Sequence, residues 1–227
     1  MLSFQIPPDG GMLYTETNMQ HLFPEPLNAI TSVFFIAIAL YWSFKLRGKY
    51  KHHAFLSVAV CMLYIGGIGG TIYHGLRQWS FFIIMDWLPI MLLCVAAGVY
   101  FLTRIIKWYY ALALAAAYIC FLGFIRNSSF AYENTQLFIN INYAVLAGMV
   151  LVPVFLFLWI SKFRYAIWVS IALIAFITAL TFRIGDNWNL LSVGTHFLWH
   201  IFGAVAAFCM FQYIYFVNEN NVPLKKS

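Results

Sequence analysis

His196 and His200 lie four residues apart within an apolar segment, residues 193–216, that is long enough to cross a bilayer. An imidazole in hydrocarbon is costly unless it has a partner. Residues at positions i and i+4 lie on one face of a helix, so both rings could bind a single ion. Two neutral imidazoles directed at one point are typical of zinc. The pair alone is equally compatible with histidines that form hydrogen bonds in a polar seam between helices.

The composition places these histidines in a membrane protein. The chain has 227 residues, of which 63% are hydrophobic and 9% are charged, and its mean hydropathy is +0.83. Such values exclude a water-soluble domain of this size. The net charge of +6 does not indicate a nucleic-acid partner, because no basic cluster is combined with aromatic residues in a soluble segment.

We expect an all-α, multi-pass integral membrane protein with seven transmembrane helices in a single domain, residues 1–227. The connections are short, and no linker or internal repeat divides the chain. Residues 1–26 lack the pattern of a cleaved signal peptide and are expected to form an ordered cap outside the membrane, and residues 218–227 a short tail. The expected spans are residues 27–44, 54–74, 81–102, 108–125, 137–160, 165–182 and 193–216.

The distribution of basic residues predicts the orientation. Ten of the 13 Lys and Arg residues lie on one side of the expected bundle and three on the other. Because basic loops are retained in the cytoplasm, we expect an outside or lumenal amino terminus and a cytoplasmic carboxyl terminus. Asn127-Ser-Ser then fits a glycosylation acceptor on the outer side. The larger group is Lys45, Arg47, Lys49, Lys51, Arg104, Lys107, Lys162, Arg164, Lys225 and Lys226, and the smaller is Arg77, Arg126 and Arg183.

This topology brings further polar residues to the outer half of the membrane. His74 closes the second span at its outer end, and Asp86 lies about six residues inward on the third. His196 and His200 lie near the outer end of the seventh span, and Ser32 lies about five residues into the first. Because separate helices place three histidines and a carboxylate at one level, the sequence predicts a metal site.

The donor set favours zinc with an open coordination position. Three histidines and a water are typical of catalytic zinc. A carboxylate beside such an ion can orient a water or accept its proton, so Asp86 is the candidate base. The alternative for Asp86 is a buried ion pair with Arg77 or Arg183.

Two packing patterns accompany the site. Glu25, Asn28 and Ser32 lie at positions i, i+3 and i+7, on one helical face, and Pro26 suits a first helical turn. We expect them to line or brace the site, although Glu25 and Asn28 equally suit the capping of the first helix. The glycines at positions 66, 67, 69 and 70 predict close helix packing in the second span.

The chain resembles the alkaline ceramidase family. That family belongs to a superfamily of seven-span membrane hydrolases that includes the progestin and adiponectin receptors and the Per1-type lipid-remodelling proteins. The resemblance rests on short motifs that occur in the family's order along the whole chain. These are Glu25-Pro-Leu-Asn28-Ala-Ile-Thr31-Ser32, Gly70-Thr71-Ile-Tyr-His74, Asp86-Trp-Leu-Pro89, Phe182-Arg183-Ile-Gly-Asp186 and His196-Phe-Leu-Trp-His200.

The resemblance implies a membrane-lipid hydrolase. It implies zinc held by His74, His196 and His200, a water activated near Asp86, and hydrolysis of the amide of a ceramide-like lipid to a sphingoid base and a fatty acid.

Two departures from the family pattern matter. The family usually has a serine four residues before the second-span histidine, where this chain has Gly70. The corresponding hydroxyl would then come from Thr31, Ser32 or Thr71, or be absent. The family also carries an acidic, tryptophan-containing amino-terminal motif that binds calcium, and this chain has no close copy. Oxygen donors left for a Ca²⁺ site or for bracing the zinc site are Asp9, Glu16, Asn18, Glu25 and Asn28.

Other functions remain as alternatives to a ceramidase-like amidase. One is a lipid receptor or lipid-binding protein with a structural zinc, and another is a hydrolase of a different lipid amide or ester. A metal or proton transporter is disfavoured because the inner halves of the expected spans hold almost no polar residues. A retinal-type photoreceptor is disfavoured because the seventh span has no lysine.

Overall fold

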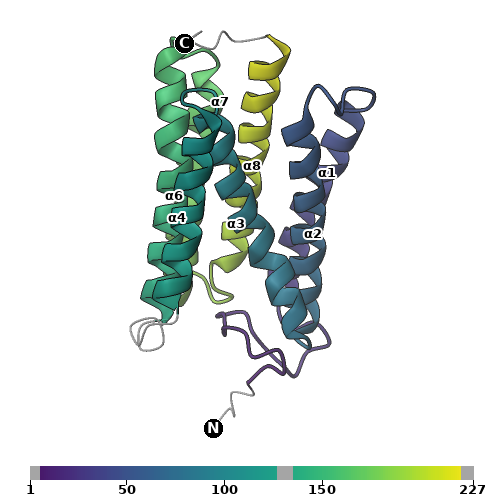
Figure 1. Cartoon of the computed structure of the whole chain (residues 1–227). Helices are drawn as coiled ribbons and strands as arrows, with labels where there is room; N and C mark the ends of the chain where they lie inside the picture. Colours follow the sequence, from purple (N-terminus) through teal and green to yellow (C-terminus); the bar gives the residue numbers. More distant parts are fainter. Residues whose placement is uncertain (1–5, 127–134, 221–227) are drawn as a thin grey trace. The chain divides into compact units, whose positions relative to one another are not determined.

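A computed structural model of the chain describes residues 6–126 and 135–220. Within these ranges the structure is helical without strands, and seven helices are long and apolar enough to cross a membrane (Figure 1). The predicted all-α, multi-pass class is thereby confirmed, while the side on which each terminus lies stays a prediction. The helices are α1 (Pro26–Lys45), α2 (Ala54–Leu76), α3 (Ser80–Leu102), α4 (Trp108–Arg126), α6 (Thr135–Ile160), α7 (Ala166–Ile184) and α8 (His196–Glu219), with a short 3-10 helix η1 (Gly185–Asn187) after α7.

Among the described residues, the chain divides into two compact units, residues 6–90 with 165–220 and residues 91–126 with 135–164. Helix α3 contributes its first half to the first unit and its second half to the second. The prediction of a single domain stays a prediction. Asn127, Lys225 and Lys226, which entered the sequence analysis, lie outside the described residues, as does most of the expected tail.

In the first unit, α1 packs against α2 and α8, and α7 packs against α8. Glycines of α2 make these approaches close. A Cβ on Gly67 would lie 2.7 Å from the side chain of Ile36 on α1, and a Cβ on Gly69 would overlap Met85 on α3. The predicted packing role of these glycines is confirmed, because α2 could not approach two neighbours so closely with larger residues.

Helix α8 begins at His196, whereas the sequence analysis placed the start of the span at Val193. Gly194 has φ +75°, a left-handed conformation that interrupts a helix. The Oδ1 atom of Asp186 accepts hydrogen bonds from the backbone N–H groups of Thr195 at 2.7 Å and His196 at 2.8 Å. A carboxylate there satisfies free amides and complements the positive end of the helix. His196 is consequently the first residue of the helix and does not lie a turn inside it.

The second unit contains no candidate metal cluster among its described residues. Its contacts are mainly apolar: Phe101 packs against Phe157 with ring centroids 5.6 Å apart. One internal hydrogen bond joins α4 to α6, from the Tyr118 hydroxyl to Asn142 Oδ1 at 2.8 Å. Exposed apolar side chains such as Phe124 suit contact with lipid.

Candidate metal centre

Three histidines of the first unit form a compact cluster. His74 lies near the end of α2, and His196 and His200 lie in the first two turns of α8. Each offers one nitrogen, and these nitrogens all lie within 4.8 Å of one another. The ring centroid of His74 is 5.4 Å from that of His196 and 4.9 Å from that of His200. All three side chains are buried, so the structure brings together the three predicted ligands.

His74 is held by a carboxylate. Its Nδ1 atom lies 2.5 Å from Glu25 Oε2, and both side chains are fully buried. Burial alone would raise the pKa of Glu25, but the hydrogen bond from His74 and the charge of Arg77 lower it below its usual range. Because the carboxylate accepts in this contact, a neutral His74 carries its proton on Nδ1 and its lone pair on Nε2. That Nε2 is buried and has no hydrogen-bond partner among the described residues.

His200 is held by the backbone of α1. Its Nδ1 lies 3.0 Å from the carbonyl oxygen of Asn28, which can only accept, so Nδ1 carries the proton. The hydroxyls of Thr31 and Ser32 lie 3.1 and 3.2 Å from the same nitrogen. Each hydroxyl donates to a carbonyl of its own helix. The lone pair of His200 is thus directed through Nε2.

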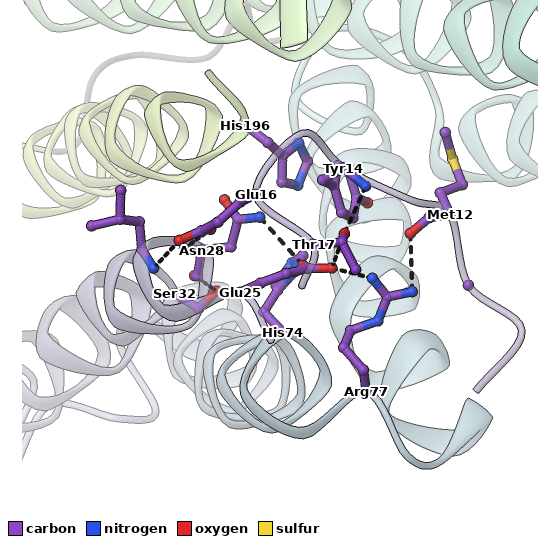
Figure 2. Close-up of polar contacts among 12 residues, drawn as sticks. Met12, Tyr14, Glu16, Thr17, Glu25, Asn28, Ser32, His74, Arg77 and His196 are labelled. Carbon is purple, nitrogen blue, oxygen red and sulfur yellow. Dashed lines mark hydrogen bonds and ion pairs between the residues drawn. The ribbon is translucent and has the colours of Figure 1, made fainter. Parts of the chain in front are cut away.

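His196 is covered by an aromatic ring that sequence reasoning missed. Tyr14 stacks on it with centroids 3.9 Å apart and an interplanar angle of 24°. Figure 2 shows Tyr14 beside His196, entering from the amino-terminal segment. The Nδ1 atom of His196 is buried without a hydrogen-bond partner among the described residues. No spacing in the sequence marks Tyr14, because it lies in a loop.

The donor set fits a zinc ion. Two buried nitrogens, on His74 and His196, lack partners, and the hydrogen bonds of His200 leave its Nε2 as a third donor. Unpaired buried polar atoms are costly, and a shared ion would satisfy them together. Three imidazoles supported by outer hydrogen bonds are the usual form of a catalytic zinc site.

Asp86 is a residue of α3, and its carboxylate lies against Gly70 of α2, four residues before His74. A Cβ on Gly70 would lie 2.5 Å from Asp86 Oδ1 and 3.0 Å from Ser32 Oγ. Because Gly70 has no side chain, the Asp86 carboxylate of α3 and the Ser32 hydroxyl of α1 can both approach α2 at this residue. The hydroxyl of Thr71 instead donates to Gly67 O of its own helix at 2.7 Å. Of the two α1 hydroxyls beside His200, Ser32 is the one that also approaches Gly70.

Arg77 is fully buried and joins the carboxylates of Asp9 and Glu25, and Figure 2 shows its pairing with Glu25. Its Nε and Nη2 donate to Asp9 at 2.8 and 3.1 Å, and its Nη1 pairs with Glu25. Arg77 has φ 52°, a left-handed conformation that costs a non-glycine residue about 1–3 kcal/mol. Because its guanidinium is shared by Asp9 and Glu25, Arg77 is not the ion-pair partner that the alternative for Asp86 required.

The amino-terminal segment is fixed over the cluster by hydrogen bonds. Thr15 binds Asp186, with its N–H 2.9 Å from Oδ2 and its hydroxyl 2.8 Å from the backbone oxygen. The Thr17 hydroxyl donates to Glu25 Oε1 at 2.7 Å. Glu16 accepts the N–H groups of Leu27 and Asn28 at 2.5 and 2.9 Å, so it caps α1. Glu16 thus acts on the helix and does not reach the histidines directly.

The expected calcium donors have other partners. Asp9 and Glu25 bind Arg77, Glu16 caps α1, and Asn18 Oδ1 accepts the N–H of Gln20 at 3.0 Å. Among the described residues, Asp9, Glu16 and Glu25 do not form a group close enough to hold an ion. These residues do not fit a calcium site as they are arranged, and Ca²⁺ binding stays a prediction of the resemblance alone.

No protein-family model matches the chain, and no curated protein sequence matches it significantly. The functional argument therefore depends on the motifs and on the geometry of the histidine cluster.

Proposed function

We propose that the chain is a zinc-dependent intramembrane hydrolase that cleaves a lipid amide, with ceramide as the expected class of substrate. One observation carries this proposal. Glu25 and the backbone oxygen of Asn28 bind the Nδ1 atoms of two histidines, whose Nε2 atoms are left for a metal. Hydrogen bonds of this kind orient the histidines of zinc enzymes. Asp86 beside the same cluster adds a carboxylate that a purely structural site would not need.

His74, His196 and His200 would hold the zinc ion. When bound, zinc would polarise the scissile carbonyl and make a nearby water more acidic. Asp86 accepts the proton from the attacking water and later passes it to the leaving amine. The Ser32 hydroxyl lies 3.2 Å from His200 Nδ1 and helps to hold that ring, and Ser32 and Asp86 both approach Gly70.

The substrate class follows from where the cluster lies. The polar residues gather at one end of α2 and α8, and the helices around them carry apolar, exposed side chains. A lipid whose amide lies near the membrane surface can bring that bond to the histidines while its chains stay in hydrocarbon. A ceramide has this form, and the motif resemblance points to the same class.

A lipid-binding protein or receptor with a structural zinc is the second candidate. Tyr14 supports it, because the ring covers His196 and leaves less space for a substrate. Such a protein would bind zinc and a lipid without cleaving the lipid.

The test compares zinc content and lipid turnover on the same purified protein. We expect one zinc ion at the His74, His196 and His200 cluster, and release of fatty acid and sphingoid base from ceramide. Chelation and His200→Ala should both abolish release, and zinc should restore it only after chelation. His21→Ala is the matched control, because His21 is exposed and bonds only Asn18 among the contacts described. Full turnover without zinc would contradict the proposal. Tight zinc without turnover of any lipid amide or ester would favour the receptor.

A further inference from the structure

Helices α2 and α8 carry a second group of metal donors at their opposite ends. His52 and His53 directly precede α2, and Glu219 is the last residue of α8. One ligand atom from each lies within 4.8 Å of the others. His74 and His196 lie at the other ends of the same helices, so this second group is separate from the candidate zinc centre.

The geometry of His53 sets this group apart from an ordinary surface ion pair. The His53 side chain is fully buried, and its Nε2 lies 2.9 Å from Glu219 Oε1. Its ring stacks on Tyr215 with centroids 4.7 Å apart and an interplanar angle of 19°. Its second nitrogen, Nδ1, is buried and has no hydrogen-bond partner among the described residues. The ring is thus fixed in place with one nitrogen directed at a carboxylate.

The Lys49 ammonium would compete with a metal ion for the Glu219 carboxylate. Its Nζ lies 3.0 and 3.2 Å from the two carboxylate oxygens of Glu219. The Lys49 side chain is 49% exposed, so the ammonium can leave the carboxylate at little cost.

We propose that His52, His53 and Glu219 form a second binding site for a divalent transition metal of the zinc class. Two imidazoles and one carboxylate are an established donor set for zinc. A bound ion would take the place of the proton between His53 and Glu219 and of the Lys49 ammonium, and it would join the start of α2 to the end of α8. The site is weaker than the buried histidine cluster, because His52 is exposed and Lys49 competes for the carboxylate. This inference does not depend on the proposed hydrolase activity.

The test titrates the purified full-length protein with zinc at neutral pH and measures the ions bound per chain. We expect a tight first equivalent and a weaker second. His52→Ala should weaken the second at least about tenfold, since even loss of an outer partner of a metal ligand costs 10- to 100-fold. His52 is exposed, and its ring lies edge-on to the His53 ring with centroids 4.7 Å apart, so His52→Ala also removes one aromatic contact. Glu219→Gln provides an independent variant and should have the same effect.

Lys49→Ala gives the opposite expectation, because it removes the competing ammonium: the second equivalent should bind more tightly. Lys51→Ala is its matched control, since it deletes the same charge from the same loop. A second equivalent that is absent, or that His52→Ala leaves unchanged, would overturn the proposal. Equal tightening by both lysine variants would also overturn it, because the effect would then be one of general charge. The first equivalent is followed in the same titration, so failure of the second site leaves the proposed function untouched.

Discussion

Glu25 accepts a hydrogen bond from Nδ1 of His74 at 2.5 Å, in a contact from which solvent is fully excluded. The same carboxylate pairs with Arg77 and accepts the Thr17 hydroxyl. Glu25 therefore links the candidate zinc centre to the amino-terminal segment. This contact fixes the orientation of the His74 ring, as expected of a residue that braces the site, and the Glu25 side chain makes no capping hydrogen bond to α1.

The first prediction concerns this link. Glu25→Gln should lower the affinity for zinc about 10- to 100-fold, the usual cost of losing the carboxylate partner of a ligating histidine. Equilibrium dialysis of zinc against a chelator measures the change.

Asp9→Asn is the control for that variant. It removes another partner of Arg77 without touching His74, so it should lower stability and leave zinc affinity per folded molecule unchanged. If both variants lose zinc to the same extent, the effect comes from the Arg77 ion pairs and not from the hydrogen bond to His74.

The second prediction concerns Arg77. Arg77→Ala should destabilise the fold by about 3–5 kcal/mol, because it leaves two buried carboxylates without their cation. Thermal unfolding in detergent measures this. Calcium should not raise the melting temperature of the unmodified protein, because the guanidinium already bridges Asp9 and Glu25. A clear stabilisation by calcium would show that these donors can bind it.

The third prediction separates the ring of Tyr14 from its hydroxyl. The ring stacks on His196, and an aromatic pair of this kind contributes about 0.5–1.5 kcal/mol. Tyr14→Ala should therefore weaken zinc binding by roughly 2- to 10-fold, whereas Tyr14→Phe should keep it. Burial raises the pKa of the Tyr14 phenol, which keeps the hydroxyl protonated at neutral pH. A loss of turnover in Tyr14→Phe with normal zinc content would assign the hydroxyl a role in binding substrate.

The helices and the cluster of three histidines were predictable from the sequence for a simple reason. A bilayer requires long apolar runs, so the lengths of those runs place each helix to within a few residues. The same topology puts His74, His196 and His200 at one end of the bundle.

The covering segment was not predictable. Thr15 is placed by Asp186, a residue 171 positions away, and no local pattern indicates such a pairing. The same carboxylate caps α8, whereas Thr195, the residue at the N-cap position, makes no capping hydrogen bond with its side chain. The Thr195 hydroxyl donates instead to Phe182 O at 2.6 Å. Tyr14 reaches His196, and Asp9 reaches Arg77, through this same amino-terminal segment, which explains why spacing alone could not assign their roles.

The fourth prediction is the orientation in the membrane. The distribution of basic residues, ten against three, predicts that Lys49 lies in the cytoplasm. A membrane-impermeant amine reagent should leave Lys49 unmodified in intact cells and modify it after permeabilisation, as read by mass spectrometry of its peptide. Modification in intact cells would show that the orientation is the opposite one, with the histidine cluster at the cytoplasmic end.

The fifth prediction concerns Asp86. Asp86→Asn should keep zinc and lower turnover by roughly 10²-fold or more, which is the usual loss of rate when a positioned acid–base group is removed. Zinc content and turnover are measured on the same sample. If Asp86 serves only as an ion-pair partner, the variant should lose stability while its folded fraction stays active.

Gly70→Ala tests the same role without changing the carboxylate. The new methyl group would meet Asp86 Oδ1 at 2.5 Å and Ser32 Oγ at 3.0 Å, so the Asp86 carboxylate must shift and the Ser32 hydroxyl must move by a few tenths of an ångström. Gly66→Ala is the matched control on the same helix, because its methyl group would lie 3.6 Å from Pro89, an ordinary contact. Turnover should fall for Gly70→Ala and persist for Gly66→Ala, with zinc retained in both. Equal turnover in the two variants would mean that the position of Asp86 beside Ser32 does not matter for the reaction, and the carboxylate would then lose its assignment as the base.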